Sequence, residues 1–205
     1  MNYKYSEDNN QLNLSFDSEK STSDLEISEE EISKKIISSN DNRKKMISIS
    51  KFIASSLEKL LKMEKKDKSI SKKRLEIFTK ERIPEISLFD YLNRIIKYIN
   101  CEESTIILSL IYLDRLSLSN VHFSIYNIHR LLFTSILLAI KNNEDKIYNN
   151  RYYSEIAGVR LSEINLMEYN FAILLKFNFY VNDITYNVYK KALEINIPSC
   201  EVKEF

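Results

Sequence analysis

Apolar residues recur every three or four positions along most of the chain, and this spacing is typical of amphipathic helices. From Met46 to about Lys65 one face is apolar, while Lys and Glu occupy the other face. The same spacing predicts further helices over about 88–99, 103–118, 126–142, 152–157, 162–176 and 183–193. Ser87 comes directly before the helix over 88–99 and is placed to cap its N-terminus.

Two of these helices carry apolar residues on more than one side. They cover 103–118 and 126–142, and the second is apolar almost continuously from Ile128 to Ile140. A helix that is apolar over most of its surface lies at the centre of a bundle. Five helices within about 90 residues, joined by short connections and with one further helix on each side, predict an all-α fold.

Glycine and proline are almost absent, because the 205 residues include one Gly and two Pro. One glycine cannot spell G-x-G-x-x-G or G-x-x-x-x-G-K, so Gly-rich phosphate-binding loops are excluded. A sheet-rich fold with many tight turns is also hard to build. The single glycine, Gly158, follows the helix predicted over 152–157, where it can adopt a left-handed C-cap conformation. The abundance of Ile, Lys and Asn indicates a compositional bias, and Asn-richness alone carries no functional meaning.

Residues 1–43 differ in composition from the rest of the chain. They include ten acidic, five basic and nine serine residues, with few apolar side chains. Such a segment cannot bury enough apolar surface to offset the entropy of ordering, so we expect a disordered acidic tail. We divide the remainder into an N-terminal helix with a basic connector (44–83), a helical domain with a C-terminal helix (84–195) and a short tail (196–205).

The overall charge is close to neutral, with 30 Lys and Arg against 29 Asp and Glu. This balance indicates neither a nucleic-acid nor a membrane-surface partner. No apolar run approaches the roughly 18 residues of a transmembrane helix, and the N-terminus lacks the layout of a signal peptide. Cys101 and Cys200 form no disulfide framework, which fits a reducing compartment. We therefore expect an intracellular protein of the nucleus, the cytoplasm or both.

No set of catalytic or metal-ligating residues emerges from the sequence. The only histidines are His122 and His129, and neither H-E-x-x-H nor C-x-x-C occurs. Cys101 and His129 can be imagined as a thiol–imidazole pair, but a buried free cysteine and a histidine in the first turn of a helix are the favoured interpretation. We expect no enzymatic activity, no metal and no cofactor.

Charged residues interrupt three otherwise apolar helices. Asp114 and Arg115 lie near the end of one, Lys141 ends the most apolar helix, and Glu168 interrupts the helix over 162–176. A lone charge at such a place usually extends to solvent. Two opposite charges on the most apolar helices can instead mark one polar spot on an apolar binding surface. Spacing alone leaves both interpretations open.

A series of motifs follows one another through the predicted bundle. In chain order they are SLFDYLNRI (87–95), Lys97-Tyr98, Cys101, IYLDRL (111–116), NIHRLL (127–132), Lys141, YNNRYY (148–153), Gly158-Val159, EIN (163–165), Glu168 and FNFYV (177–181). In this order they resemble the cyclin box of P/U-type cyclins, which are related to the yeast phosphate-pathway regulatory subunit. The resemblance covers about 46–195, most of the part expected to fold.

The resemblance implies a single five-helix cyclin box, flanked here by an extra N-terminal helix and a C-terminal helix. The apolar spacing predicts the same number of helices. The resemblance also implies a non-catalytic regulatory subunit that binds and activates a cyclin-dependent protein kinase in cell-cycle or nutrient-linked control. The expected assembly is a heterodimer, in which ATP and Mg²⁺ belong to the kinase.

Site residues follow from the same resemblance. In cyclins, a lysine that ends the third box helix and a glutamate in the fifth hydrogen-bond backbone groups around the kinase's mobile helix. Lys141 and Glu168 match these two positions. The matches to kinase-facing apolar positions are Leu138, Tyr169, Phe177 and Phe179, and the matches to structural positions are Asp114, Arg115 and Gly158.

The chain departs from the family pattern at several positions. Asn142 and Asn143 follow the lysine where many cyclins have an aromatic residue, and Ala157 stands where a second glycine often precedes Gly158. The arginine that most cell-cycle cyclins carry in the first box helix has no match, and no second box is expected after Leu193. Two alternatives stay open: a transcriptional adaptor, which would favour a basic groove, and a degenerate box that serves only as a helical scaffold.

Overall fold

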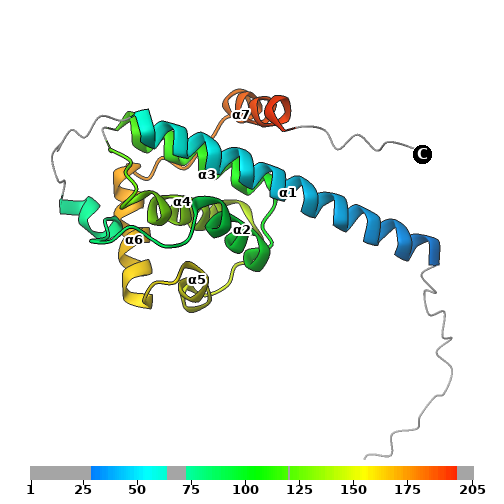
Figure 1. The fold of residues 1–205 in the computed structure, drawn as a ribbon, viewed down its shortest axis with the longest axis horizontal. Coiled ribbons are helices and arrows are strands. Elements are labelled where there is room, and N and C mark those ends of the chain that lie inside the picture. The colour runs from blue at the N-terminus through cyan, green and yellow to red at the C-terminus, as the bar shows by residue number, and fades with distance from the viewer. Residues whose placement is uncertain (1–28, 64–72, 120, 198–205) are drawn as a thin grey trace, which may run out of the picture. The chain divides into compact units, whose positions relative to one another are not determined.

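The computed structural model of the chain describes residues 29–63, 73–119 and 121–197, with side chains over 38–62, 75–119 and 121–197 (Figure 1). By its internal contacts the chain divides into Met1–Ile37 and Ser38–Phe205. The fold described below is that of the second part. Every regular element in the described ranges is helical, which confirms the predicted all-α class.

The helices reproduce the predicted order closely. They are α1 (Glu29–Met63), the 3₁₀-helix η1 (Lys73–Phe78), α2 (Leu88–Ile99), α3 (Glu103–Leu118), α4 (Ile128–Asn143), α5 (Asn150–Ala157), α6 (Leu161–Leu174) and α7 (Asp183–Asn196). Helices α2 and α3 have the bounds that the apolar spacing predicts, and α7 extends past its predicted end at Leu193.

Helix α1 begins at Glu29, well before the start predicted at Met46. Residues 29–43 are therefore helical where a disordered tail is expected, while 1–28 lie outside the described residues. This stretch lacks Gly and Pro, and its Glu30–Lys34 and Glu31–Lys35 spacing favours a helix. Over 38–45 apolar periodicity cannot detect the helix, because the side chains there are all exposed.

Helix α4 lies at the centre of the second part, as its apolar sequence predicts. Every residue from Arg130 to Ile140 is buried. Helices α2, α3, α5, α6 and η1 all contact α4. Because neighbouring helices surround it, α4 reaches solvent mainly at its two ends.

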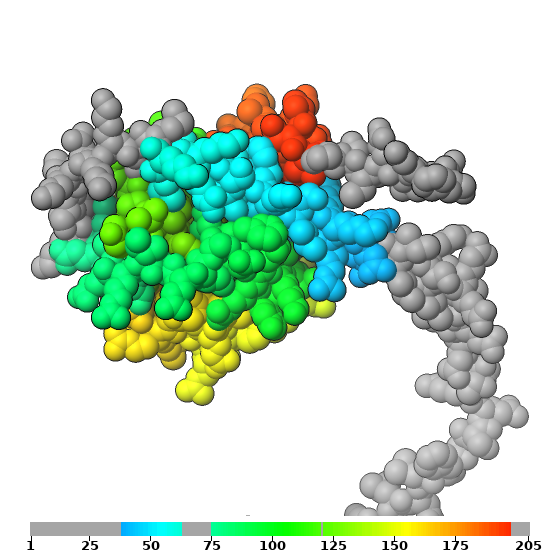
Figure 2. All heavy atoms as spheres, in the orientation of Figure 1, coloured from blue at the N-terminus to red at the C-terminus, as the bar shows by residue number. Residues whose placement is uncertain are grey.

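The C-terminal helix α7 packs on α3 at the edge of the bundle. Leu193 of α7 is buried against Ile107 and Ile111 of α3, and Phe52 of α1 joins this small cluster. Figure 2 shows α7 (red) beside α1 (cyan) at the surface. The outer side of α7 exposes Ile184 and Ile195.

The predicted connector between α1 and α2 contributes to the core. Its residues 73–78 form η1, and the Phe78 side chain is fully buried. The Phe78 ring meets the ring of Phe171 in α6 edge-on, with 6.2 Å between centroids. A lone aromatic residue in a basic segment has no periodicity, which is why the sequence pattern does not reveal this contact.

Short polar side chains define where several helices begin and end. The Ser87 hydroxyl accepts a hydrogen bond from the Asp90 amide at 3.0 Å, which confirms the predicted cap of α2. Gly158 ends α5 with φ of 67°, the left-handed conformation predicted for it. Asn149 and Asn182 cap α5 and α7 in the same way as Ser87 caps α2.

The turn after α6 places two residues other than glycine in the left-handed region. Lys176 has φ of 53° and Phe177 has φ of 55°. The Lys176 amide donates to the Ile173 carbonyl and the Phe177 amide to the Ala172 carbonyl, the hydrogen-bond pattern that usually has glycine after the helix. Each such conformation costs a side-chain-bearing residue about 1–2 kcal/mol.

We expect Lys176→Gly to stabilise the protein by about 0.5–1 kcal/mol, because relief of the left-handed strain exceeds the entropy that glycine adds to the unfolded chain. The matched control is Lys191→Gly, since Lys191 is exposed in the interior of α7. There glycine lacks this benefit and should cost about 1 kcal/mol. Urea unfolding of both variants checks the prediction, and a loss of stability in Lys176→Gly would contradict it.

Candidate functional site

Lys141 and Glu168 lie together at the surface. Lys141 is in the last turn of α4 and Glu168 is in α6, and the Lys141 Nζ lies 2.6 Å from the Glu168 Oε1. Their side chains are 25% and 23% exposed, so both remain accessible from solvent. The two charges therefore lie together as one polar spot, whereas its place on an apolar binding surface stays a prediction.

Asn150, the first residue of α5, completes this polar spot. Its Nδ2 donates to the Glu168 Oε2 at 2.8 Å and to the Asn165 Oδ1 at 2.8 Å. Both oxygens of Glu168 therefore have partners, and the carboxylate is fixed in orientation. Asn150 belongs to the YNNRYY motif, but the sequence does not reveal its role, because nothing in the spacing brings the start of α5 to the middle of α6.

The apolar residues predicted around this pair differ in accessibility. Tyr169 and Phe177 are 61% and 64% exposed, so their rings project into solvent. Leu138 is buried one turn before Lys141, and Phe179 is half-buried with its ring 5.7 Å from that of Tyr112. Tyr169 and Phe177 are therefore accessible at the surface, whereas Leu138 is buried and Phe179 is only partly accessible.

Asp114 and Arg115 connect α3 to the chain that follows α6. The Arg115 guanidinium donates to the Asn178 carbonyl at 2.7 Å and to the Tyr180 carbonyl at 2.8 Å. The Asp114 carboxylate accepts a hydrogen bond from the Tyr189 hydroxyl at 2.6 Å. Burial, followed by this hydrogen bond to Asp114, raises the pKa of Tyr189 to about 12.

The two asparagines that depart from the family pattern have local partners. The Asn142 side chain is exposed and donates to the Leu138 carbonyl of its own helix. The Asn143 side chain donates to the hydroxyls of Ser104 and Thr105, both at 2.9 Å. Asn143 therefore ties the end of α4 to the start of α3, whereas Asn142 leaves a polar surface beside Lys141.

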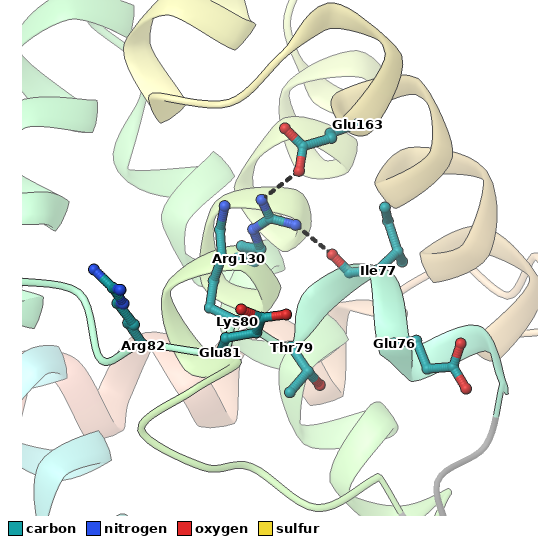
Figure 3. A pocket seen from close by; sticks show the side chains of 8 residues that line it. All are labelled: Glu76, Ile77, Thr79, Lys80, Glu81, Arg82, Arg130 and Glu163. Carbon is teal, nitrogen blue, oxygen red and sulfur yellow. Dashed lines mark hydrogen bonds and ion pairs between the residues drawn. The ribbon is translucent and has the colours of Figure 1, made fainter.

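A second ion pair lies at the other end of α4 (Figure 3). The Arg130 Nη2 lies 2.7 Å from the Glu163 Oε1 of α6, and Arg130 also donates to the Ile77 carbonyl of η1. The side chains of Arg130 and Glu163 are 7% and 17% exposed. They line an open cavity of about 510 Å³ together with η1 and the segment that follows it. Arg130 belongs to the NIHRLL motif and Glu163 to the EIN motif, but their spacing in the sequence does not reveal that they pair.

The environment of Glu163 favours its charged form. Burial raises the pKa of Glu163, but hydrogen bonds from Arg130 and Arg160 outweigh burial and lower the pKa to about 2. The Arg160 amide contributes one of these bonds at 3.1 Å, at the start of α6. This ion pair joins three elements of the fold, and its burial favours a structural role.

The thiol and imidazole considered in the sequence have separate partners. The His129 Nε2 is 3.1 Å from the Ile86 carbonyl, and its ring packs edge-on against Tyr91. Burial, together with the nearby charge of Glu144, raises the pKa of Cys101 to about 12. A thiol with such a pKa stays protonated and is a poor nucleophile. Cys200 lies outside the described residues.

Other classes of site find no counterpart in the described part of the chain. No cluster of three or more His, Cys, Asp or Glu side chains there could hold a metal ion. Among the described helices, none combines the length and apolarity needed to cross a membrane. The candidate functional site is the polar spot of Lys141, Glu168 and Asn150, with Tyr169 and Phe177.

A family model and several known proteins are similar to this chain. A family model described as cyclin matches residues 17–179. Cyclin-U4-1 of Arabidopsis thaliana is 32% identical over 158 residues, which cover 75% of this chain and 78% of that protein. Cyclin-U4-2 of the same plant is 37% identical, covering 60% of this chain and 57% of that protein. Cyclin-P4-1 of Oryza sativa subsp. japonica is 35% identical, covering 54% and 53%.

We expect Glu163→Gln to destabilise the protein by about 2 kcal/mol near pH 7, since it leaves the buried Arg130 charge without a counter-ion. The pKa of Glu163 is about 2 in the folded chain against an ordinary value of 4.5. The ion pair therefore contributes fully above about pH 4.5 and loses its contribution as the pH falls towards 2.

Urea unfolding of wild type and Glu163→Gln from pH 7 to pH 3 checks this prediction. The difference in unfolding free energy should shrink as the pH falls, while Glu194→Gln on the exposed side of α7 should show little difference at any pH. A difference that stays constant down to pH 3 would show that the charge of Glu163 is not what stabilises this site.

Proposed function

Since the chain belongs to the cyclin family, we propose that it binds and activates a cyclin-dependent protein kinase. The U-type and P-type names of its relatives agree with the resemblance drawn from its motifs. A regulatory role of the cyclin type follows from family membership. Kinase activation, and its place in cell-cycle or nutrient-linked control, are the steps that we add. The kinase provides the catalytic groups and binds ATP and Mg²⁺.

The observation that carries this proposal is the accessible ion pair of Lys141 and Glu168. The Lys141 ammonium has three N–H donors, and the pair with Glu168 uses one of them. A helix end of a partner offers unpaired carbonyl and amide groups. Lys141 can donate to such a carbonyl and Glu168 can accept from such an amide, in charge-assisted hydrogen bonds. Asn150 keeps the carboxylate oriented for this contact.

The exposed aromatic rings supply the apolar part of the interface. Tyr169 follows Glu168 directly, and Phe177 projects from the turn after α6. Large aromatic residues near a desolvated polar contact commonly dominate binding energy. A kinase helix held against this surface keeps its glutamate paired with the catalytic lysine, which is the active arrangement.

The alternative is a cyclin-box adaptor or scaffold that does not activate a kinase. Asn142 is the observation that favours it, because an exposed amide stands beside Lys141 where many cyclins have an aromatic anchor. An adaptor of the transcriptional type would also use a basic groove. The cavity near Arg130 does not provide one, because Glu76, Glu81 and Glu163 line it as well.

We expect the Lys141→Ala/Glu168→Ala variant to lose kinase binding and kinase activation. Truncating a charged group that is hydrogen-bonded within an interface costs about 2–5 kcal/mol, much of it because the partner's groups are left buried and unpaired, so the double change should weaken binding more than a hundredfold. The test is affinity capture of the tagged protein from its own cells, with kinase activity measured on each eluate. Lys191→Ala/Glu194→Ala on the exposed side of α7 is the charge-matched control.

The outcomes separate the two functions. Kinase activity with wild type and the control, but not with the double variant, supports activation through this site. Equal activity with all three proteins means that the site lies elsewhere. A wild-type eluate that contains partners but no kinase favours the adaptor or scaffold.

A further inference from the structure

The turn that displays Phe177 has an unfavourable backbone conformation. Lys176 and Phe177 both have φ near 55°, and neither is glycine. Residues other than glycine stay in this conformation only where surrounding contacts hold them there. The Phe177 ring is 64% exposed, so its own packing contributes little to that restraint.

Contacts from both sides fix this turn. On the α6 side, the Lys176 amide donates to the Ile173 carbonyl at 2.9 Å, and the Phe177 amide donates to the Ala172 carbonyl at 2.8 Å. The Asn178 amide also donates to the Leu175 carbonyl at 3.0 Å, so bonds from the α6 side extend to Asn178. The carbonyls of the chain after Phe177 are held from α3.

Helix α3 binds three consecutive carbonyls immediately after Phe177. Arg115 donates to the carbonyls of Asn178 and Tyr180, and the Tyr112 hydroxyl donates to the carbonyl of Phe179 at 3.0 Å. Two of the three bonds come from one guanidinium, whose rigid fork can span two acceptors. A lysine ammonium has the charge but not the fork.

We propose that Arg115 is a positioning residue for the partner surface, acting by holding the strained turn that presents Phe177. The inference rests on the proposed function, because it assumes that Phe177 contacts the kinase. Arg115 acts from α3 on the backbone of 178–180, and Phe177 makes the contact. Partner affinity thus depends on a residue that belongs to neither the Lys141–Glu168 pair nor the exposed rings.

The free protein tests the restraint itself. We expect Arg115→Ala to speed backbone amide hydrogen exchange over 176–181 about tenfold, because opening this segment no longer breaks two charge-assisted bonds. Exchange in α2 and α5 should stay unchanged. Unchanged exchange over 176–181, or an equal rise throughout the chain, would overturn the restraint.

Binding to the kinase recovered with wild type tests the consequence. Arg115→Ala should weaken affinity about tenfold, as expected for coupled neighbours, and Arg115→Lys should restore only part of the loss. In a Phe177→Ala background, Arg115→Ala should cause almost no further loss. Adding Lys176→Gly to Arg115→Ala should recover part of the affinity, because glycine adopts the left-handed turn without restraint.

The failures of the two proposals are distinguishable. Additive losses from Arg115→Ala and Phe177→Ala would mean that Arg115 does not act through Phe177, even though the kinase binds. Wild-type affinity in Phe177→Ala would remove Phe177 from the interface and overturn the inference while leaving the function intact. If no kinase is recovered with the wild-type protein, both the proposed function and the proposed effect of Arg115 on kinase affinity are overturned. Amide exchange would still show whether Arg115 holds the turn.

Discussion

The burial of α4 is the constraint from which both ion pairs follow. From Arg130 to Ile140 no residue of this helix faces solvent, so charge is accommodated only where the helix ends. At each end a basic side chain meets a glutamate of α6, Glu163 at one end and Glu168 at the other. The two basic residues are about 16 Å apart along α4, but the two glutamates are only about 7 Å apart along α6. The helices therefore cross rather than run parallel, as Figure 1 shows.

The two ion pairs differ in solvent exposure, and therefore in how much they contribute to stability. Arg130 and Glu163 are nearly enclosed, and a buried pair has a desolvation cost that its hydrogen bonds must offset. Their additional bonds to η1 and to the start of α6 offset part of this cost, and they fix three elements together. Lys141 and Glu168 keep about a quarter of their side-chain surface exposed. In water such a pair contributes little to stability, so its charges can be redirected to a partner at small cost to the fold.

Sequence reasoning identified what depends on local pattern and missed what depends on the assembled chain. The limits of α2, the cap at Ser87 and the left-handed Gly158 follow from nearest neighbours, and all three were predicted. Phe78, Asn150 and the partner of Arg130 become meaningful only when segments far apart in sequence meet. The meeting of Lys141 and Glu168 was one of two interpretations left open. Their role toward a kinase, like that of Leu138, Tyr169, Phe177 and Phe179, stays a prediction.

Because glycine is scarce, asparagine or strained residues occupy left-handed positions at helix ends where glycine is usual. Asn100 ends α2 in the left-handed region, a role that glycine usually fills, and asparagine tolerates it better than other residues with side chains. Asn149 and Asn182 are N-caps. Some asparagines therefore have a structural role, although their overall abundance indicates a compositional bias. After α6 the chain has Lys176 and Phe177 where no asparagine relieves the strain.

The hydrogen bonds that Lys141 and Glu168 already make limit how much binding energy this pair can add. Lys141 and Glu168 already bond to each other and to Asn150, so a partner exchanges existing hydrogen bonds for new ones. Such an exchange favours partners whose backbone groups fit both charges and yields little net energy. In the proposed complex, most of the affinity would then come from exposed apolar side chains such as Tyr169 and Phe177. Because Asn142 adds an amide where an aromatic residue would add apolar area, we expect binding in that complex to depend all the more on how firmly the turn holds Phe177 in place.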